Sequence, residues 1–151
     1  LSMKGRTVDS LLAQVQRWHR QLSKESGNGL QWTPCGLKGL EFVEGSQEKQ
    51  NMRRWQIQEL TSARALNSEG RAMRHCVASY AGSCARGQTS IWSMTVDSYE
   101  GTRRVLTIEV RLNSKTICQA RGRYNERPTE KARNIMNRWA AQEGLTAAAY
   151  V

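Results

Sequence analysis

Positive charge dominates the 151-residue sequence, in which 23 lysines and arginines stand against 13 aspartates and glutamates, for a net charge of +10. The length fits one domain with its own core, and no run approaches the roughly 18 apolar residues that span a bilayer, so we expect no membrane partner. The four cysteines form no C-x-x-C pair, which argues against a disulfide scaffold and favours free thiols in a reducing cytoplasm.

The N-terminal part of the chain combines one helix with a long loop. Apolar residues spaced three and four apart predict a helix over Val8–Leu22, which the glycines of SKESGNG end. The loop that follows is rich in glycine and contains one short strand candidate, GLEFVEG. We therefore assign residues 1–50 to an N-terminal helix and loop extension. Because LSMKG does not resemble a natural N-terminus, we interpret the chain as a fragment of a longer protein.

The middle of the chain is expected to be mainly helical. One helical region is predicted over Trp55–Leu60, and Thr61 or Ser62 can cap a second, short helix that Gly70 ends. The stretch MRHCVASY continues the helical tendency and contains His75, one of the two histidines of the chain. We expect this histidine on the flank of an apolar helical face.

Three later stretches alternate apolar and polar residues, which predicts the strands GQTSIWSMTV, RRVLTIEVR and TICQARG. Thr129 can then cap a helix that Gly144 ends. Its predicted buried face consists of Ala132, Ile135, Met136, Trp139 and Ala140. Residues 146–151 resemble a tail.

The register of the last two strands follows from their side chains. A three-residue loop at 113–115 gives four pairs: Val110 with Cys118, Ile108 with Ala120, Glu109 with Gln119, and Thr107 with Arg121. This register separates an apolar face from a polar face, as a half-buried antiparallel sheet requires, whereas a two-residue loop mixes them. We predict an α+β domain in which a small antiparallel β-sheet of about three strands packs against several α-helices.

Positive charge is concentrated in and after the predicted hairpin. Residues 103–138 hold ten basic and three acidic residues, for a local charge of +7. Such a patch attracts polyanions, and the phosphate backbone of DNA or RNA is the first candidate partner. Binding of an acidic protein partner, or a basic surface without a dedicated partner, are the alternatives.

Several motifs in the second half of the chain are similar to those of one known family. They are W-x-I-x-E-L from Trp55, L-x-x-E-G-x-x-M-x-H-C-V-x-x-Y from Leu66, T-I-E-V from Thr107 and Q-x-R-G-x-x-N from Gln119. On these motifs residues 52–143 resemble the PcfJ-like domain family of bacterial conjugative plasmids, integrated elements and phages. We assign 51–145 to this core and 146–151 to a tail. The resemblance implies a bacterial cytoplasmic protein near DNA or RNA transactions and supplies no reaction.

Polar positions within these motifs mark the candidate site. The family's recurring polar positions are His75, Glu109, Gln119, Arg121 and Asn125. Because guanidinium groups bind phosphate through paired hydrogen bonds, we expect nucleic-acid contacts from an arginine-rich set. The set is Arg111, Gln119, Arg121, Arg123, Asn125 and Arg127. Tyr124 or Trp92 is a candidate for stacking on an unpaired base, with a place in the core or on the plain surface as the alternative. The predicted role is a nucleic-acid-associated accessory domain of a mobile genetic element.

An enzyme is the second hypothesis. His75 would act as general acid or base, Glu109 as its partner and Arg121 as stabiliser of a phosphate-like charge, in a nuclease or a nucleotide-directed transferase. No cofactor is expected, because neither a carboxylate cluster typical of Mg²⁺ nor a glycine-rich phosphate loop is present.

A zinc site and a protein-interaction module complete the alternatives. Zinc ligation by His75, Cys76 and Cys84 is disfavoured because their spacing matches no compact ligand pattern, so no metal is expected. In an interaction module His75 would merely be hydrogen-bonded in the core. The sequence leaves open whether His75 reaches Glu109 in space, and a separation beyond about 10 Å would exclude a shared acid–base site.

Overall fold

A six-stranded sheet forms the centre of the computed structural model, which describes residues 29–46, 48–75, 77–149 and 151. The strands are β1 (Leu40–Glu44), β2 (Arg53–Leu60), β3 (Thr89–Ser98), β4 (Gly101–Arg111), β5 (Thr116–Arg121) and β6 (Thr146–Ala147). They lie in chain order across the sheet, and each of the first four is antiparallel to the next. Only β6 is parallel to its neighbour β5. The helix predicted over 8–22 lies outside the described residues.

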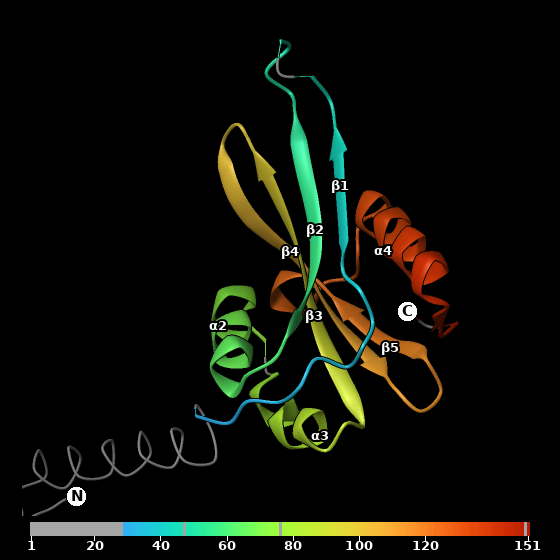
Figure 1. Ribbon diagram of the computed structural model, residues 1–151. Helices are drawn as coiled ribbons and strands as arrows, with labels where there is room; N and C mark the ends of the chain where they lie inside the picture. The colour runs from blue at the N-terminus through green and yellow to red at the C-terminus, as the bar shows by residue number, and fades with distance from the viewer. Residues whose placement is uncertain (1–28, 47, 76, 150) are drawn as a thin grey trace, which may run out of the picture.

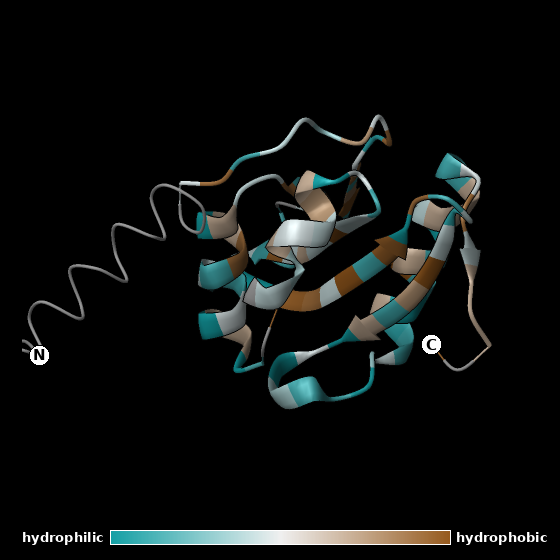
Figure 2. Cartoon of the chain, turned by 90° about the horizontal axis from the view of Figure 1, so that it is seen from below, coloured by the Kyte–Doolittle hydropathy of each residue, from teal (hydrophilic) through white to brown (hydrophobic). Residues whose placement is uncertain are grey.

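Three short α-helices accompany this sheet in the described part of the chain (Figure 1): α2 (Ala63–Met73), α3 (Ala81–Ala85) and α4 (Glu130–Glu143). Two single 3₁₀ turns, Ala78–Tyr80 and Arg123–Asn125, connect elements. In Figure 1 the sheet curls strongly into a half-barrel, with α4 on one side and α2 and α3 on the other. Figure 2, viewed from below, shows the strands between these two groups of helices.

The predicted fold class, about three antiparallel strands packed against several helices, is therefore wrong. The sheet has six strands and mixed direction, and the described residues contain more strand than helix. The main cause is Trp55–Leu60, which was expected to be helical and forms most of β2. Trp55 and Ile57 are both buried, so their spacing of two residues is the strand period. The strand candidate GLEFVEG forms β1, and residues 146–147 add β6.

One face of the sheet holds the main core under α4. Alternate residues of β2 to β5 point into it, among them Trp92, Met94 and Ile108. From α4 the five predicted residues Ala132, Ile135, Met136, Trp139 and Ala140 are all buried. The ring centroids of Trp92 and Trp139 lie 4.8 Å apart. The helix ends are also as predicted, since the Thr129 side chain caps the first turn and Gly144 ends the helix with φ of 70°.

The opposite face carries a smaller apolar cluster and most of the polar side chains of the sheet. Leu66 of α2 and Ile91 of β3 belong to this cluster. Ser62 caps α2, in line with one of the two predicted caps. The helix runs past Gly70 to Met73, and it does not continue through MRHCVASY as expected, because Arg74 turns into the left-handed region with φ of 57°.

The predicted hairpin register is confirmed at three of its four pairs. Thr107 pairs with Arg121, Ile108 with Ala120, and Glu109 with Gln119. The fourth pair differs, because a β-bulge after Glu109 places Val110 opposite Ile117 and leaves Cys118 as the extra residue. The separation into an apolar and a polar face follows: Ile108 and Val110 are fully buried under α4, and Glu109 and Gln119 lie on the other face.

Candidate functional site

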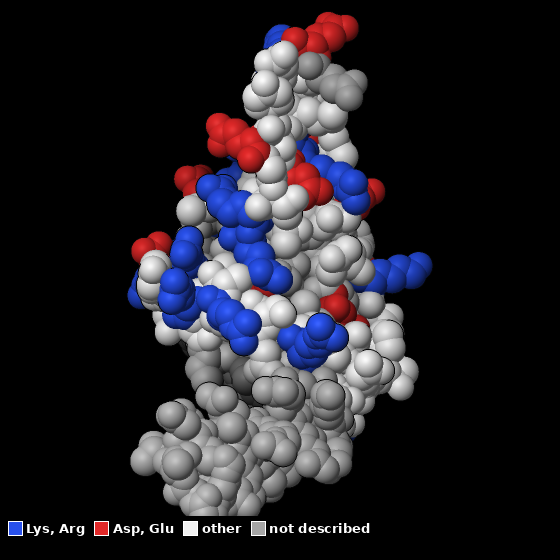
Figure 3. Space-filling view, turned by 90° about the vertical axis from the view of Figure 1, so that its left-hand side faces the viewer, with Lys and Arg blue, Asp and Glu red and all other residues white. Residues whose placement is uncertain are grey.

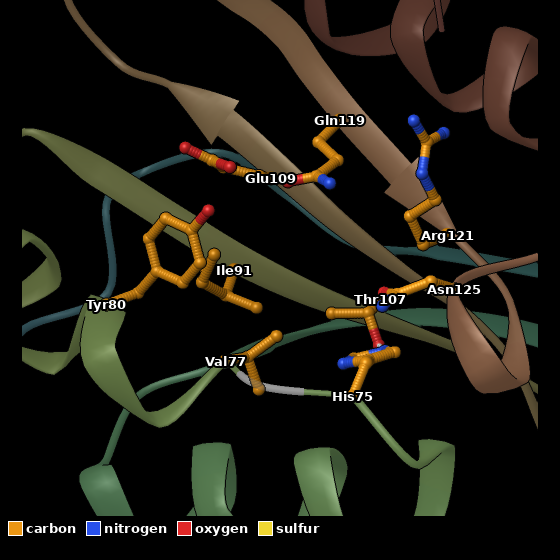
Figure 4. Close-up of a pocket in the computed structure, with 9 residues that line it drawn as sticks. All are labelled: His75, Val77, Tyr80, Ile91, Thr107, Glu109, Gln119, Arg121 and Asn125. Carbon is orange, nitrogen blue, oxygen red and sulfur yellow. Dashed lines mark hydrogen bonds between the residues drawn. The ribbon is translucent and has the colours of Figure 1, made fainter.

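A small polar pocket lies between the sheet and the segment after α2 (Figure 4). Its lining comes from His75, Val77, Tyr80, Ile91, Thr107, Glu109, Gln119, Arg121 and Asn125. All five recurring polar positions from the motif analysis are therefore in one place. Its volume of about 40 Å³ gives room for a few water molecules or one small chemical group.

The end of α2 positions His75. Because Arg74 is left-handed, the backbone turns back on the helix, and the His75 amide donates to the Gly70 carbonyl at 3.1 Å. A Cβ atom on Gly70 would lie 2.8 Å from the His75 carbonyl oxygen. Glycine at position 70 therefore permits the close approach that directs the imidazole to the sheet.

A buried glutamate connects α2 to the same face of the sheet. Glu69 is 1% exposed. It accepts hydrogen bonds from Ser93 Oγ at 2.9 Å and from Thr107 Oγ1 at 2.5 Å. Its Oε1 also lies 3.0 Å from Nε of Arg104, which is half exposed. Thr107 Oγ1 is in turn 3.0 Å from His75 Nε2. A continuous chain of contacts thus links Arg104, Glu69, Thr107 and His75.

Burial shifts the pKa of two members of this series of contacts, Glu69 and His75. Desolvation raises the pKa of Glu69, and its hydrogen bonds from Thr107 and Ser93 and the charge of Arg104 oppose that shift. Desolvation also lowers the pKa of His75, with a smaller opposing contribution from its own backbone. The imidazole is therefore neutral at pH 7, and one of its ring nitrogens is free of a proton.

The turn after β5 is, like the turn at Arg74, a segment near the pocket with left-handed backbone conformation. Tyr124 and Asn125 both adopt left-handed conformations, with φ of 59° and 62°. Asparagine tolerates this region, whereas tyrosine does so at a cost of about 1–2 kcal/mol. The turn closes through a 2.7 Å bond from the Gly122 amide to the Glu126 carbonyl. It brings Asn125 to the pocket and leaves Tyr124 62% exposed.

Glu109 and Arg121 line the pocket without contacting His75. In Figure 4 the Glu109 carboxylate lies on the Tyr80 side of the pocket, whereas the imidazole lies on the Thr107 side. The Arg121 guanidinium points away from His75 and donates to the Ala120 carbonyl at 3.0 Å. The direct hydrogen-bond partner of the imidazole is Thr107. His75, Glu109 and Arg121 thus line the same pocket, and neither Glu109 nor Arg121 contacts the imidazole.

Next to the pocket lies a basic groove of about 780 Å³, and lysines and arginines gather on this side of the molecule (Figure 3). Its basic lining residues are Arg53, Arg103, Arg104, Arg123, Arg127 and Lys131, against one acid, Glu126. Arg104 is bound to Glu69, and Lys131 to Glu44. The other four have no carboxylate partner within 4.0 Å among the residues that the structure describes.

The predicted nucleic-acid contacts divide between these two places. Gln119, Arg121 and Asn125 line the pocket, and Arg123 and Arg127 line the groove. Arg111 lies in neither, since it occupies the far end of β4. Of the two aromatic candidates for base stacking, Tyr124 is exposed, whereas Trp92 is 1% exposed and belongs to the core.

The sequence interpretation missed Glu69, Thr107 as its partner, and the groove residues of β2. One signal was available for Glu69, since it lies three residues after Leu66 and four before Met73, both buried. An acid on the apolar stripe of a helix indicates a buried partner. Arg53 and Arg103 gave no such signal, because their proximity depends on the pairing of β2 with β3 and of β3 with β4.

The described part of the chain contains no metal-binding cluster, and two of its thiols have raised pKa values. No three histidines, cysteines, aspartates or glutamates are placed there to hold a metal ion, and Cys76 lies outside it. Burial raises the pKa of Cys84 to about 12 and that of Cys118 to about 11, so both thiols stay protonated at neutral pH. Of the helices that the structure describes, none has the length and apolarity to cross a membrane.

The fold and the site define a basic domain with a polar pocket on one face of a curled sheet. The family model described as PcfJ-like protein matches residues 12–136, and the chain belongs to this family. The match starts well before the motif-bearing stretch of 52–143. A search of curated proteins and a search of solved structures each returned no match.

Proposed function

We propose that the protein binds the phosphate backbone of DNA or RNA along the basic groove. The observation that carries this proposal is the groove's charge, six basic side chains against one acid. Four of these arginines have no carboxylate partner among the described residues, so their charge is available to a ligand. Guanidinium groups bind phosphate through two parallel hydrogen bonds, and each neutralised phosphate releases counterions.

The edge of the groove offers a second contact suited to a nucleic acid. The exposed ring of Tyr124 lies 5.4 Å from the guanidinium of Arg123. An aromatic ring beside a cation supports stacking of an unpaired base next to a bound phosphate. This arrangement favours single-stranded nucleic acid, or the end of a duplex, as the partner.

The wider role that we propose is an accessory domain of a bacterial mobile genetic element, acting in the cytoplasm. This role rests on the resemblance of the motifs to proteins of conjugative plasmids and phages. The low acid content of the groove also suits an acidic protein partner, which is the competing proposal.

A salt titration with variants of the groove tests the proposal. Binding of labelled single-stranded DNA, duplex DNA and RNA is measured between low and physiological salt, for the wild type and for the triple variant Arg103→Gln/Arg123→Gln/Arg127→Gln. We expect affinity to fall linearly with salt on a double-logarithmic plot. The slope should decrease by about one for each arginine that contacts a phosphate.

Arg86→Gln is the matched control, because Arg86 is an exposed arginine beside α3 that lies outside the groove. It should retain the wild-type slope. The control removes one charge and the triple variant removes three, so a loss in the control of about one third of the loss in the triple variant would mean that net charge alone drives binding. Absence of binding at low salt would contradict the proposal and direct attention to a protein partner.

A further inference from the structure

Arg104 differs from the four unpartnered arginines of the groove, because a buried carboxylate holds it. Its Nε lies 3.0 Å from Oε1 of Glu69. The Glu69 side chain is 1% exposed, and hydrogen bonds from the Ser93 and Thr107 hydroxyls fix its position. The Arg104 side chain is 40% exposed and lines the groove. One end of this guanidinium is therefore anchored in the protein while the other reaches the groove.

A β-bulge in β4 turns Arg104 to the face of the sheet that holds Glu69. The register between β3 and β4 shifts at this point, and Val105 is left as the extra residue of β4. In a regular strand, residues two apart point to the same face, so Arg104 would follow the buried Leu106 into the core under α4. The bulge instead brings the guanidinium to the carboxylate, so the local backbone is shaped for this contact.

The atom of Arg104 that makes the contact decides what is left for a ligand. A guanidinium has five N–H donors, and Nε carries one of them. A carboxylate bound at Nε fixes the plane of the group and leaves N–H donors of the terminal nitrogens for a second acceptor. A flexible arginine loses side-chain entropy when it binds a ligand, whereas Arg104 is ordered beforehand. Its terminal nitrogens therefore form a prearranged donor pair for a phosphate group.

We propose that Arg104 is the oriented phosphate-binding residue of the groove and that Glu69 is the residue that positions it. Its ligand is one phosphodiester group of the bound strand, so this inference rests on the proposed function. Glu69 offsets part of the charge of Arg104, so the pair adds little long-range attraction. The four unpartnered arginines supply that attraction, and the Arg104 pair fixes where along the groove one phosphate lies.

Two glutamate variants of the full chain separate positioning from net charge. Glu69→Gln and Glu126→Gln each remove one negative charge, and Glu126 is the exposed acid that lines the same groove. By charge alone, both variants should bind a polyanion more tightly.

We expect opposite signs when binding of labelled single-stranded DNA is measured at one fixed salt concentration. Glu126→Gln should bind about twofold more tightly. Glu69→Gln should bind several-fold more weakly, because a neutral amide holds the Arg104 guanidinium less firmly and its single oxygen is shared with the Ser93 and Thr107 hydroxyls. Urea unfolding of both variants shows that each is folded in the assay. Binding by folded Glu69→Gln that equals or exceeds that of the wild type would overturn the proposal.

A second pair of variants keeps the charge and leaves Glu69 in place, so it decides the question if Glu69→Gln does not fold. In Arg104→Lys, Glu69 and the phosphate compete for one nitrogen, and affinity should fall about tenfold. Arg123→Lys should cost only about twofold, because an arginine without a carboxylate partner acts mainly through its charge. Equal losses in the two variants would overturn the proposal. Absence of binding by the wild type would contradict the proposed function itself, whereas salt-dependent binding with equal losses would contradict only the role of Arg104 and Glu69.

Discussion

Glu69 places a carboxylate on the buried face of a short helix, whose other buried residues, Ala63, Leu66 and Met73, are all apolar. Desolvation of a charge costs several kcal/mol, and the attraction of one partner seldom offsets it. Three donors are directed at this carboxylate, two hydroxyl groups of the sheet and the Arg104 guanidinium. A leucine would join α2 to the sheet at lower cost, and it would provide nothing to hold the imidazole of His75.

Stability should decrease at acidic pH partly because of His75. Burial lowers the pKa of His75 below its usual 6.5, so the folded protein binds this proton more weakly than the unfolded chain does. The stabilisation is complete above pH 6.5 and is lost as the pH falls through 6.5 toward the pKa of the folded state. The check is urea unfolding between pH 7.5 and 5.

His75→Asn is the comparison for this measurement, because asparagine is polar and does not titrate. The free energy of unfolding of the wild type should fall more steeply below pH 6.5 than that of the variant. Parallel pH profiles would mean that His75 has the same pKa in both states. Glu69 contributes with the opposite sign, since its raised pKa favours the folded state at low pH. Both profiles contain its contribution, so the difference between them isolates His75.

The elements that could be predicted from the sequence are those whose signals are local. Helix α4 has a capping threonine, a terminal glycine and five buried residues at helical spacing, and all of these were correctly predicted. The segment Trp55–Leu60 has too few residues for its period to be decisive, and its strand conformation depends on pairing with β1 and β3. The left-handed turn at Arg74 could not be predicted, because the residue at this position is not a glycine.

In the candidate site, too, some features follow from local sequence signals and others depend on contacts between distant segments. The register of β4 and β5 follows from their own residues, and it identified Glu109, Gln119 and Arg121 as members of one polar face. His75 joins this face through the backbone turn after α2, which no local pattern predicts. The groove needs β2, β4 and the turn after β5 together, so it depends on the complete sheet topology.

Gly70→Ala tests how strongly the end of α2 constrains His75. Alanine adds about 1 kcal/mol of helix propensity. Its Cβ would, however, lie 2.8 Å from the His75 backbone oxygen, a group that cannot move without the turn. We expect the clash to outweigh the gain, with a net loss of about 1–2 kcal/mol in the free energy of unfolding. The pKa of His75 should move back toward 6.5 as the ring leaves its place.

Gly82→Ala is the control in α3, where the new Cβ would meet the flexible end of Arg86 at 3.2 Å. This neighbour can move away, so we expect unchanged or slightly increased stability and an unchanged His75 pKa. If both variants behave alike, the close contact at Gly70 does not position the histidine.

In the whole molecule, one face of the sheet holds the main hydrophobic core and the other holds the candidate site. The α4 face holds the large core, including the contact between Trp92 and Trp139. The opposite face holds the pocket, the Glu69 network and a smaller apolar cluster. Polar groups can gather on this second face because the first supplies most of the buried apolar surface.

This division predicts that stability and ligand binding can be changed separately. Trp139 is fully buried, and its indole donates to the Lys38 carbonyl at 2.7 Å. Trp139→Phe removes this bond and leaves a small cavity, so we expect a loss of about 2 kcal/mol in the free energy of unfolding. The salt dependence of nucleic-acid binding should stay that of the wild type, measured at a temperature where the variant is folded.

Arg123→Gln should give the reverse result. Arg123 is exposed, so its replacement should change the free energy of unfolding by less than about 0.5 kcal/mol, whereas the slope of binding against salt should decrease by about one. The two variants together separate the roles of the faces, because each should alter one measurement and preserve the other. A folded Trp139→Phe protein with a reduced salt slope would show that packing under α4 reaches the groove through the sheet, and the two faces would then have to be treated as one cooperative unit.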